Sequence, residues 1–191
     1  MGMARNPLRR SELADAGLRI LAGEGARGLT HRAIDDEAGV PRGTASNYFK
    51  TRADVIAGLI ERIGERLAPD PHVHESLGAM PPSPELFGAY IRDIVARLIA
   101  NREVTLALFE LRLEASRHPD IRNALGAWQS SSFAADVEFN LAAGLPGGAK
   151  EVALFHYAID GLLLDRLTYP IDPDTSTDEV VDALVAGLLH G

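Results

Sequence analysis

Hydrophobic positions along this chain recur at helical spacing, and no segment shows a convincing strand alternation. Apolar residues at positions 13, 16, 17, 20 and 21 lie on one face of a first helix, which the glycines of residues 25–28 end. A second apolar stripe runs over four turns between residues 55 and 67. Further helical patterns cover residues 85–100, 103–117, 120–143, 149–168 and a last stretch that begins near Thr177. The pattern therefore predicts an all-α protein.

Between the first two stripes, residues 30–50 hold two short helices and a turn, too few residues to form a core of their own. Thr30 is a good N-cap, and Gly39 stands where a helix would close with a left-handed residue. After the turn, residues 42–48 leave room for about two more helical turns, and Thr51 then caps a third, longer helix. A helix, a short turn containing glycine and a second helix have the spacing of a helix-turn-helix.

The second short helix presents polar donors outward. Its apolar pair, Ala45 and Phe49, is expected to face the unit's own core, which leaves side chains that donate to phosphate oxygens or base edges. Among the outward-facing positions of this helix and the residues after it, the first carboxylate is that of Asp54. We therefore predict DNA contacts from Thr30, Arg42, Gly43, Thr44, Ser46, Asn47, Tyr48, Lys50 and Arg52. Within this set, Thr44 and Asn47 are the candidates for base contacts.

The order of residues in this segment also matches a known pattern, carried by Thr30, Ala33-Ile34, Ala38-Gly39-Val40, Gly43-Thr44, Tyr48-Phe49 and Arg52. Residues 30–55 thus resemble the N-terminal module of the TetR family of bacterial repressors. Ser46 stands where that family usually has a tyrosine, so an aromatic phosphate contact would fall to Tyr48. The resemblance implies an N-terminal three-helix DNA-binding domain and a C-terminal helical domain that binds a ligand and forms a homodimer.

Five prolines between residues 69 and 84 mean that no long helix can cross this stretch. We expect a DNA-binding domain at residues 1–52, a connecting helix at 53–68, a proline-rich loop at 69–84 and a ligand-binding and dimerisation domain at 85–191. His72 and His74 in the loop are interpreted as a solvated turn, not a metal site. The basic arm of residues 1–10, with Arg5, Arg9 and Arg10, could reach DNA or be a solvated tail.

The charge is polarised along the chain. Residues 1–68 hold 11 Lys and Arg against 9 Asp and Glu, a net charge of +2, whereas residues 69–191 hold 8 against 18, a net charge of −10. These give the overall charge of −8. An acidic body and a basic N-terminal third agree with DNA contact through the latter. The acidic run Asp35, Asp36 and Glu37 is interpreted as the solvent side of a short helix.

Composition excludes several kinds of site. The chain has no cysteine, so it can form neither a disulfide nor a thiolate metal site. We find no nucleophile elbow and no phosphate-binding loop of the right spacing, and we predict no catalytic residues and no cofactor. Because no apolar leader and no window of transmembrane length occurs, a soluble cytoplasmic protein without membrane contact is expected.

Two sets of residues in the body are candidates for binding. The first is aromatic and polar and is expected to line a ligand pocket, with ordinary core packing as the alternative; it comprises Phe87, Tyr90, Phe109, Arg112, Trp128, Phe133, His156 and Tyr157. The second reflects the apolar excess of the last two helices and is expected at a dimer interface. Its members are Phe155, Ala158, Leu162, Leu163, Leu184 and Leu188.

The sequence therefore predicts a homodimeric transcriptional regulator that binds a double-stranded DNA operator and responds to a small-molecule effector, most simply as a repressor. One alternative is a regulator whose body only dimerises and binds no ligand. Another is a helical binding protein or enzyme in which the helix-turn-helix is incidental. Salt-dependent binding to DNA would separate the last alternative from the other two.

Overall fold

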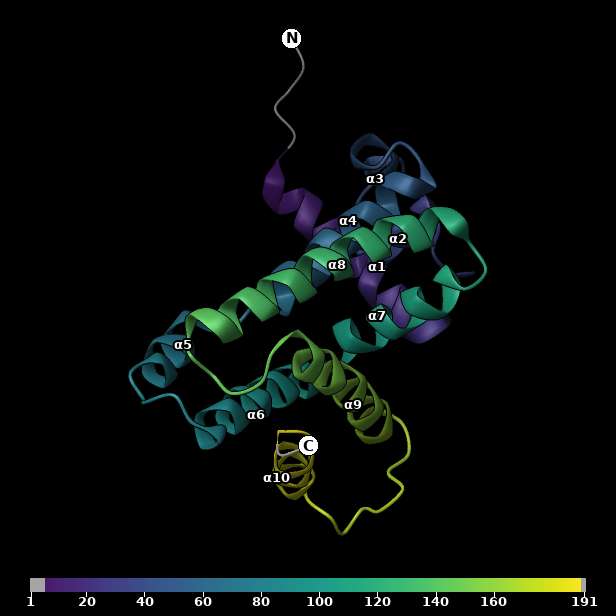
Figure 1. Cartoon of the computed structure of the whole chain (residues 1–191). Coiled ribbons are helices and arrows are strands. Elements are labelled where there is room, and N and C mark those ends of the chain that lie inside the picture. Colours follow the sequence, from purple (N-terminus) through teal and green to yellow (C-terminus); the bar gives the residue numbers. More distant parts are fainter. Residues whose placement is uncertain (1–5, 190–191) are drawn as a thin grey trace. The chain divides into compact units, whose positions relative to one another are not determined.

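The computed structural model describes residues 6–189, and these form ten helices and no strand, as the hydrophobic pattern predicts (Figure 1). The arm residues before position 6, Arg5 among them, lie outside the described part. The helices are α1 (Pro7–Glu24), α2 (His31–Glu37), α3 (Thr44–Tyr48), α4 (Arg52–Arg66), α5 (Pro71–Gly78), α6 (Pro84–Ala100), α7 (Arg102–Ala115), α8 (Pro119–Ala142), α9 (Ala149–Leu167) and α10 (Thr177–Leu188).

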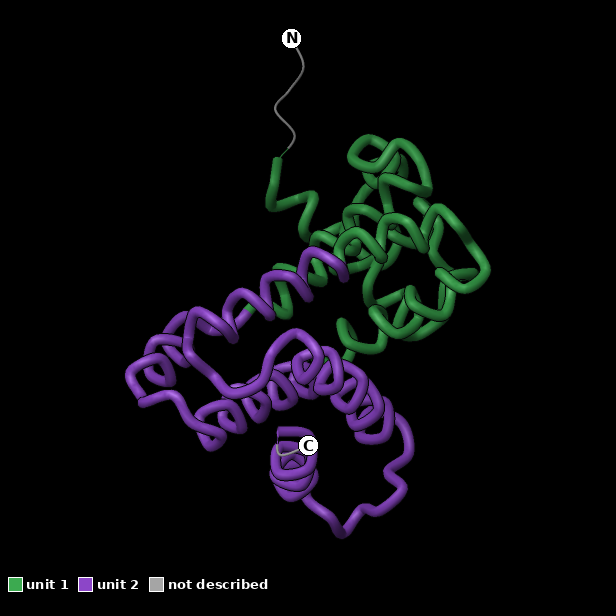
Figure 2. Tube along the Cα trace, viewed as in Figure 1, with its two compact units in different colours: residues 1–68, 101–128 green, residues 69–100, 129–191 purple. Residues whose placement is uncertain are grey.

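The helices form two compact units (Figure 2). Unit 1 contains residues 1–68 and 101–128, and unit 2 contains residues 69–100 and 129–191, so the division falls inside α8. This differs from the expected boundaries, which assigned residues 85–191 to a single domain. The reason is the extent of the N-terminal core: α7 adds Val104, Ala107 and Leu111 to the apolar side chains that α1 and α4 bury there.

The core of unit 1 is built around α1, which contacts α2, α4 and α7. Close approach to α4 depends on Gly17, since a Cβ there would lie 2.8 Å from the Leu59 side chain. The first part of α8 adds Ile121 and Leu125, both buried, to the same core. The N-terminal segment is therefore held by helices from the middle of the chain.

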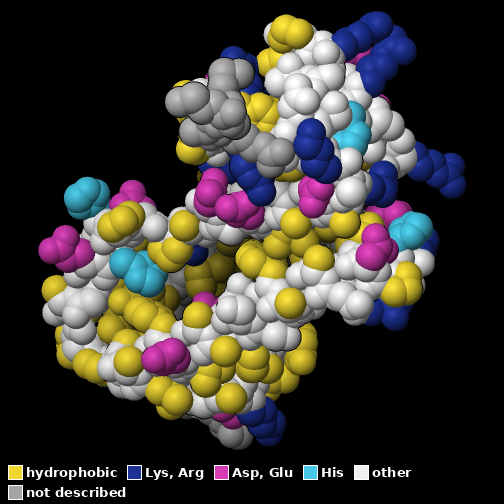
Figure 3. Space-filling model, turned by 90° about the horizontal axis from the view of Figure 1, so that it is seen from above, with side chains coloured by type: hydrophobic (Ala, Val, Ile, Leu, Met, Phe, Trp, Pro, Cys, Tyr) yellow, Lys and Arg dark blue, Asp and Glu magenta, His cyan; other side chains and the backbone are white. Residues whose placement is uncertain are grey.

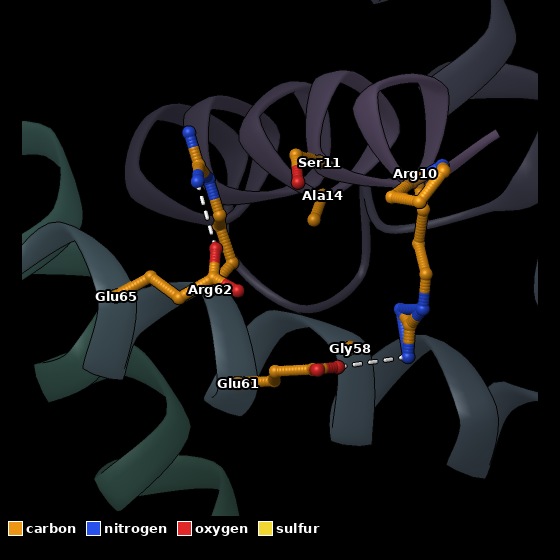
Figure 4. A pocket seen from close by; sticks show the side chains of 8 residues that line it. Arg10, Ser11, Ala14, Gly58, Glu61, Arg62 and Glu65 are labelled. Atoms are coloured by element: carbon orange, nitrogen blue, oxygen red, sulfur yellow. Dashed lines mark hydrogen bonds and ion pairs between the residues drawn. The ribbon is translucent and has the colours of Figure 1, made fainter.

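Ion pairs flank a small cleft of about 100 Å³ between α1 and α4 (Figure 4). Arg10 pairs with Glu61 at 2.9 Å, and Arg62 bridges Glu65 and Asp15 at 2.8 Å each. Burial alone would raise the pKa of the Asp15 carboxyl, but the hydrogen bonds and charges of its two arginine partners outweigh burial and lower that pKa. This network fixes the register of α1 against α4.

In unit 2, α6 packs against α9 and α10, and the rings of Phe87 and Phe155 lie 4.7 Å apart between α6 and α9. An ion pair between Arg92 and Asp182 joins α6 to α10. The unit therefore has its own apolar core, independent of α1.

The expected proline-rich loop contains a helix, which corrects the prediction for residues 69–84. Pro71 occupies the first turn of α5, where proline is favourable, and the Asp70 side chain accepts a hydrogen bond from the backbone N–H of His72 at 2.8 Å. His74 is not part of a solvated turn, because its ring packs against the rings of Tyr90 and Phe139 at 5.2 Å each.

Candidate nucleic-acid interface

The helix-turn-helix forms as the capping signals predict. The Thr30 hydroxyl accepts a hydrogen bond from the N–H of Ala33 at 3.1 Å and so begins α2. Gly39 in the turn and Gly43 before α3 both have positive φ, at 65° and 89°. Since Gly43 is left-handed, α3 begins at Thr44, two residues later than the sequence suggests. The recognition helix therefore has only five residues.

A buried carboxylate holds the start of α3. Asp35 is only 2% exposed, and its two oxygens accept hydrogen bonds from the N–H groups of Gly43 at 2.7 Å and Ala45 at 2.6 Å. The interpretation of Asp35 as a solvent-facing residue was wrong, although its neighbour Asp36 is exposed. The carboxylate satisfies backbone donors that a helix of this length cannot satisfy itself, so Asp35 fixes where α3 starts relative to α2.

The end of α3 is held as firmly as its start. Phe49 is buried, and its carbonyl accepts a hydrogen bond from His31 Nε2 at 2.8 Å. The Arg10 guanidinium lies 5.0 Å from the centre of the Phe49 ring. The ring also meets Gly58, where a Cβ would come within 2.5 Å of it. The short helix is thus supported by contacts from α1, α2 and α4.

Six of the nine predicted DNA-contact residues are exposed: Thr30, Arg42, Gly43, Asn47, Lys50 and Arg52. Thr44 and Ser46 are half-buried and use their hydroxyls within the turn. Thr44 donates to the carbonyl of Pro41 at 2.5 Å, and Ser46 donates to the carbonyl of Gly43 at 3.0 Å.

Tyr48 is half-buried and packs on the core of unit 1. This packing fixes the place of the aromatic ring for which a phosphate contact is predicted.

The side chain of Arg52, a predicted contact residue, is hydrogen-bonded to two backbone carbonyls. Its guanidinium donates to the carbonyls of Ala26 and Leu29 at 3.3 Å each, and so ties the start of α4 to the turn before α2. Arg52 and Thr30 also border a groove of about 720 Å³ whose other wall comes from α7. The sequence gives no sign of this bracing role, because the two carbonyls lie 26 and 23 residues away.

The predicted ligand residues are divided between the two units. Phe109, Arg112 and Trp128 belong to unit 1, where Trp128 packs on the core and the Arg112 guanidinium lies 5.9 Å from the Phe109 ring centre. The other five belong to unit 2: Phe87, Tyr90, Phe133, His156 and Tyr157.

Within unit 2, four of the five enter aromatic contacts. Tyr90 packs edge-on against Phe139 at 5.1 Å, and burial raises the pKa of its phenol. The ring of Phe133 lies 5.8 Å from that of His156, whose Nε2 is 3.0 Å from an Asp136 oxygen. Phe87 packs on Phe155, as described above. Tyr157 is the exception, since it is 71% exposed.

The predicted dimer residues need a correction. Phe155, Leu162 and Leu163 are buried within the single chain, so they belong to the core of unit 2 and have no surface to offer a partner. Ala158, Leu184 and Leu188 are half-buried. The apolar side chains that α9 does expose are Tyr157 and Leu164, seven residues apart and therefore on one face. The apolar pattern did not tell which face of α9 is inward.

Other site types find no support in residues 6–189. No group of three or more His, Asp or Glu side chains there could hold a metal ion. None of the helices in this part is both long and apolar enough to cross a membrane. Hydrophobic side chains do reach the surface over wide areas, seen in yellow in Figure 3.

Solved structures with the same fold include regulators. A member of the TetR family from Streptomyces coelicolor A3, SCO1917, is 27% identical, with a TM-score of 0.72 over 96% of this chain and 99% of that one. The multidrug binding protein EbrR in complex with ethidium is 25% identical, with a TM-score of 0.69 over 96% and 99% of the two chains. EbrR in complex with malachite green gives 25% identity and a TM-score of 0.64 over the same shares.

The family assignment rests on the C-terminal part of the chain. No curated protein matches the sequence. The model of the tetracyclin repressor-like C-terminal domain matches residues 82–191, which is more than half of the chain. The N-terminal helix-turn-helix and this C-terminal match agree, and the chain belongs to the tetracyclin repressor-like, or TetR, family of transcriptional regulators.

Proposed function

We propose that this chain is a repressor that binds a near-palindromic operator as a homodimer and is released by a small hydrophobic or aromatic effector. The observation that carries the proposal is the recognition helix α3, which is capped by Asp35, anchored by Phe49 and flanked by exposed Arg42, Asn47 and Lys50. A short helix fixed at both ends, with donors outside, is suited to reading base edges while its neighbours contact phosphates.

A dimer is part of the proposal because one head is too small. The five residues of α3 reach only a few base pairs, whereas specific sites must be bound roughly 10³ to 10⁷ times more tightly than other DNA. Two-fold pairing doubles the contacts and sets half-sites about 34–36 Å apart. The exposed face of α9, with Tyr157 and Leu164, is the surface that we assign to this pairing.

Unit 2 is the proposed place of effector binding. Its aromatic contacts form two groups, Tyr90 with Phe139 and Phe133 with His156, and the His156 ring also contacts the Asp136 carboxylate. Mostly apolar surroundings with a few polar groups are typical of small-molecule sites. The similarity to EbrR, whose structures hold ethidium and malachite green, supports an aromatic effector.

The test is binding to a labelled fragment of the DNA upstream of the gene, followed by anisotropy over a range of salt concentrations. We expect affinity that falls steeply with salt, and release when malachite green is added. Malachite green with DNA alone is the control for dye binding to the duplex. Salt-dependent binding without any release, together with no dye-induced thermal shift, would support the ligand-independent regulator, and no DNA binding would refute the proposal.

A further inference from the structure

The helix α8, the longest of the described part, is held firmly near both of its ends. Its first part, residues 119–128, belongs to unit 1, where Ile121 and Leu125 are each 2% exposed. Near its other end, in unit 2, Asn140 is 3% exposed, and its side-chain N–H group donates to the carbonyl of Gly147 at 3.1 Å. Buried side chains therefore fix the helix on both sides of its middle.

The segment between these anchors, residues 129–138, has little packing of its own. None of its residues is buried. No helix of unit 2 packs closely along it, and Figure 1 shows this part of α8 running apart from α6 and α9. It begins with Gln129 and a run of three serines, and serine favours a helix less than alanine does. Because helices in proteins are stabilised mostly by packing, these turns, about three in number, depend largely on their own backbone hydrogen bonds.

One side chain of α9 joins this segment to another helix of unit 2. The ring of His156 lies 5.8 Å from that of Phe133, and its Nε2 is 3.0 Å from an Asp136 oxygen. Within the described part of the chain, the side chains of residues 129–138 make no other hydrogen bond, ion pair or ring contact outside α8. The side chains of His156 and Asp136 are 46% and 55% exposed, so their pairing contributes little stability.

We infer that residues 129–138 form a lid over the effector site of unit 2, which opens by local unwinding and is latched by His156. Opening exposes no buried side chain, and the anchors at Leu125 and Asn140 keep the rest of α8 in place. The inference rests on the proposed effector binding, because Phe133 and Asp136 belong to the proposed site. It adds the route by which the effector enters.

The contacts of the latch also indicate what can replace it. The His156 ring packs edge-on against Phe133 and approaches the Asp136 carboxylate, so a flat aromatic molecule with a positive charge can take its place on both. Such a molecule would cover Phe133 and Val137, which the chain alone leaves half-buried. An aromatic cation therefore enters through the open lid and orders it on binding.

Hydrogen exchange of the whole chain, followed by mass spectrometry, tests the lid without any ligand. We expect peptides from residues 129–138 to exchange roughly tenfold faster, or more, than those from residues 119–128 and from α9. His156→Ala should speed exchange of the lid by a further factor of about two to ten, which corresponds to the loss of one aromatic pair, and should leave α10 unchanged. Uniform exchange along α8 would overturn the lid and leave the proposed function standing.

A stiffened lid tests its role in effector entry. Alanine at all three serine positions, Ser130→Ala, Ser131→Ala and Ser132→Ala together, raises helix propensity. It should slow both exchange of the lid and association of malachite green roughly tenfold. Asn123→Ala is the matched control, since it raises helix propensity at an exposed position in the anchored part of α8 and should leave both rates unchanged.

The two rates together separate the outcomes. Slower exchange with an unchanged association rate would mean that the dye enters by another route, and would overturn the lid alone. A wild type that binds no malachite green would overturn the lid together with the proposed aromatic effector. Slower exchange and slower association in the serine variant, with neither change in Asn123→Ala, is the result that supports the lid.

Discussion

The stability of the recognition helix should depend on the buried carboxylate of Asp35. Each of its two hydrogen bonds to backbone N–H groups involves a charged acceptor, and such bonds are worth about 1.5 to 3 kcal/mol. The cost of burying the carboxylate offsets part of that gain. Asp35→Ala removes both bonds and leaves the donors of Gly43 and Ala45 unpaired, so we expect a loss of about 3 kcal/mol. For a chain of this length that lowers Tm by about 6–12 °C.

Urea unfolding of matched variants measures this effect. Asp35→Asn keeps one acceptor oxygen but turns an amide N–H toward the other backbone donor, so its loss should be intermediate. Asp36→Ala is the control, since Asp36 is exposed and pairs with Arg32 at 3.7 Å, an interaction worth about 0.3 to 0.5 kcal/mol. Operator affinity should follow the same order, because Thr44 and Asn47 lie on the helix that Asp35 positions.

The reasoning would be refuted by equal stabilities of Asp35→Ala and Asp36→Ala. A stable Asp35→Ala variant with unchanged operator affinity would mean that neighbouring contacts, and not the carboxylate, determine where α3 begins. A Tm that falls while operator affinity holds would confine the role of Asp35 to stability.

Three further predictions follow from the same unit. Lys50→Ala should weaken binding about equally on all DNA sequences and reduce the slope of log affinity against log salt by roughly 1, as anisotropy titrations would show. Gly58→Ala should destabilise the chain by about 1 to 3 kcal/mol in urea, since its Cβ would press on Phe49, whereas Gly23→Ala, where a Cβ meets nothing within 4 Å, should stabilise it by about 0.4 to 1 kcal/mol. The folded-state pKa of Asp15 is lowered, so its contribution is present above the ordinary value of 3.8 and is lost as pH falls below it; the stability gap between wild type and Asp15→Asn should close in that acid range.

Local signals allowed much of the fold to be predicted. A helix cap joins residues only three positions apart, so it can be recognised in the sequence. Thr30 and Thr51 begin their helices as expected, and Asp54 completes a capping box with Thr51. Apolar spacing placed the long helices to within one or two residues. In contrast, the prolines of residues 69–84 predict no long helix, yet Pro71 opens the short helix α5, because proline is tolerated in the first turn of a helix.

Contacts between distant residues could not be predicted in the same way. Asp35 meets residues eight and ten positions later only because the turn brings α3 back over the end of α2. Likewise, an apolar pattern gives the number of faces of α9 but not their direction, which is why buried Leu163 and exposed Leu164 could not be told apart. Such assignments need the neighbouring helices, whose packing the periodicity of one segment does not contain.

The position of the acidic groups explains how a chain of net charge −8 can present a DNA-binding surface. Exposed charges act strongly only within about a Debye length, roughly 8 Å at physiological salt, so the side chains nearest α3 dominate the local field. Two of the carboxylates there accept hydrogen bonds from backbone N–H groups: Asp35 at the start of α3, and Asp54 from the N–H of Thr51, the N-cap of α4. The cations Arg42 and Lys50 remain exposed beside them. Net charge sums groups that do not face the same surface, whereas the field at a helix of five residues depends on the few charges nearest to it.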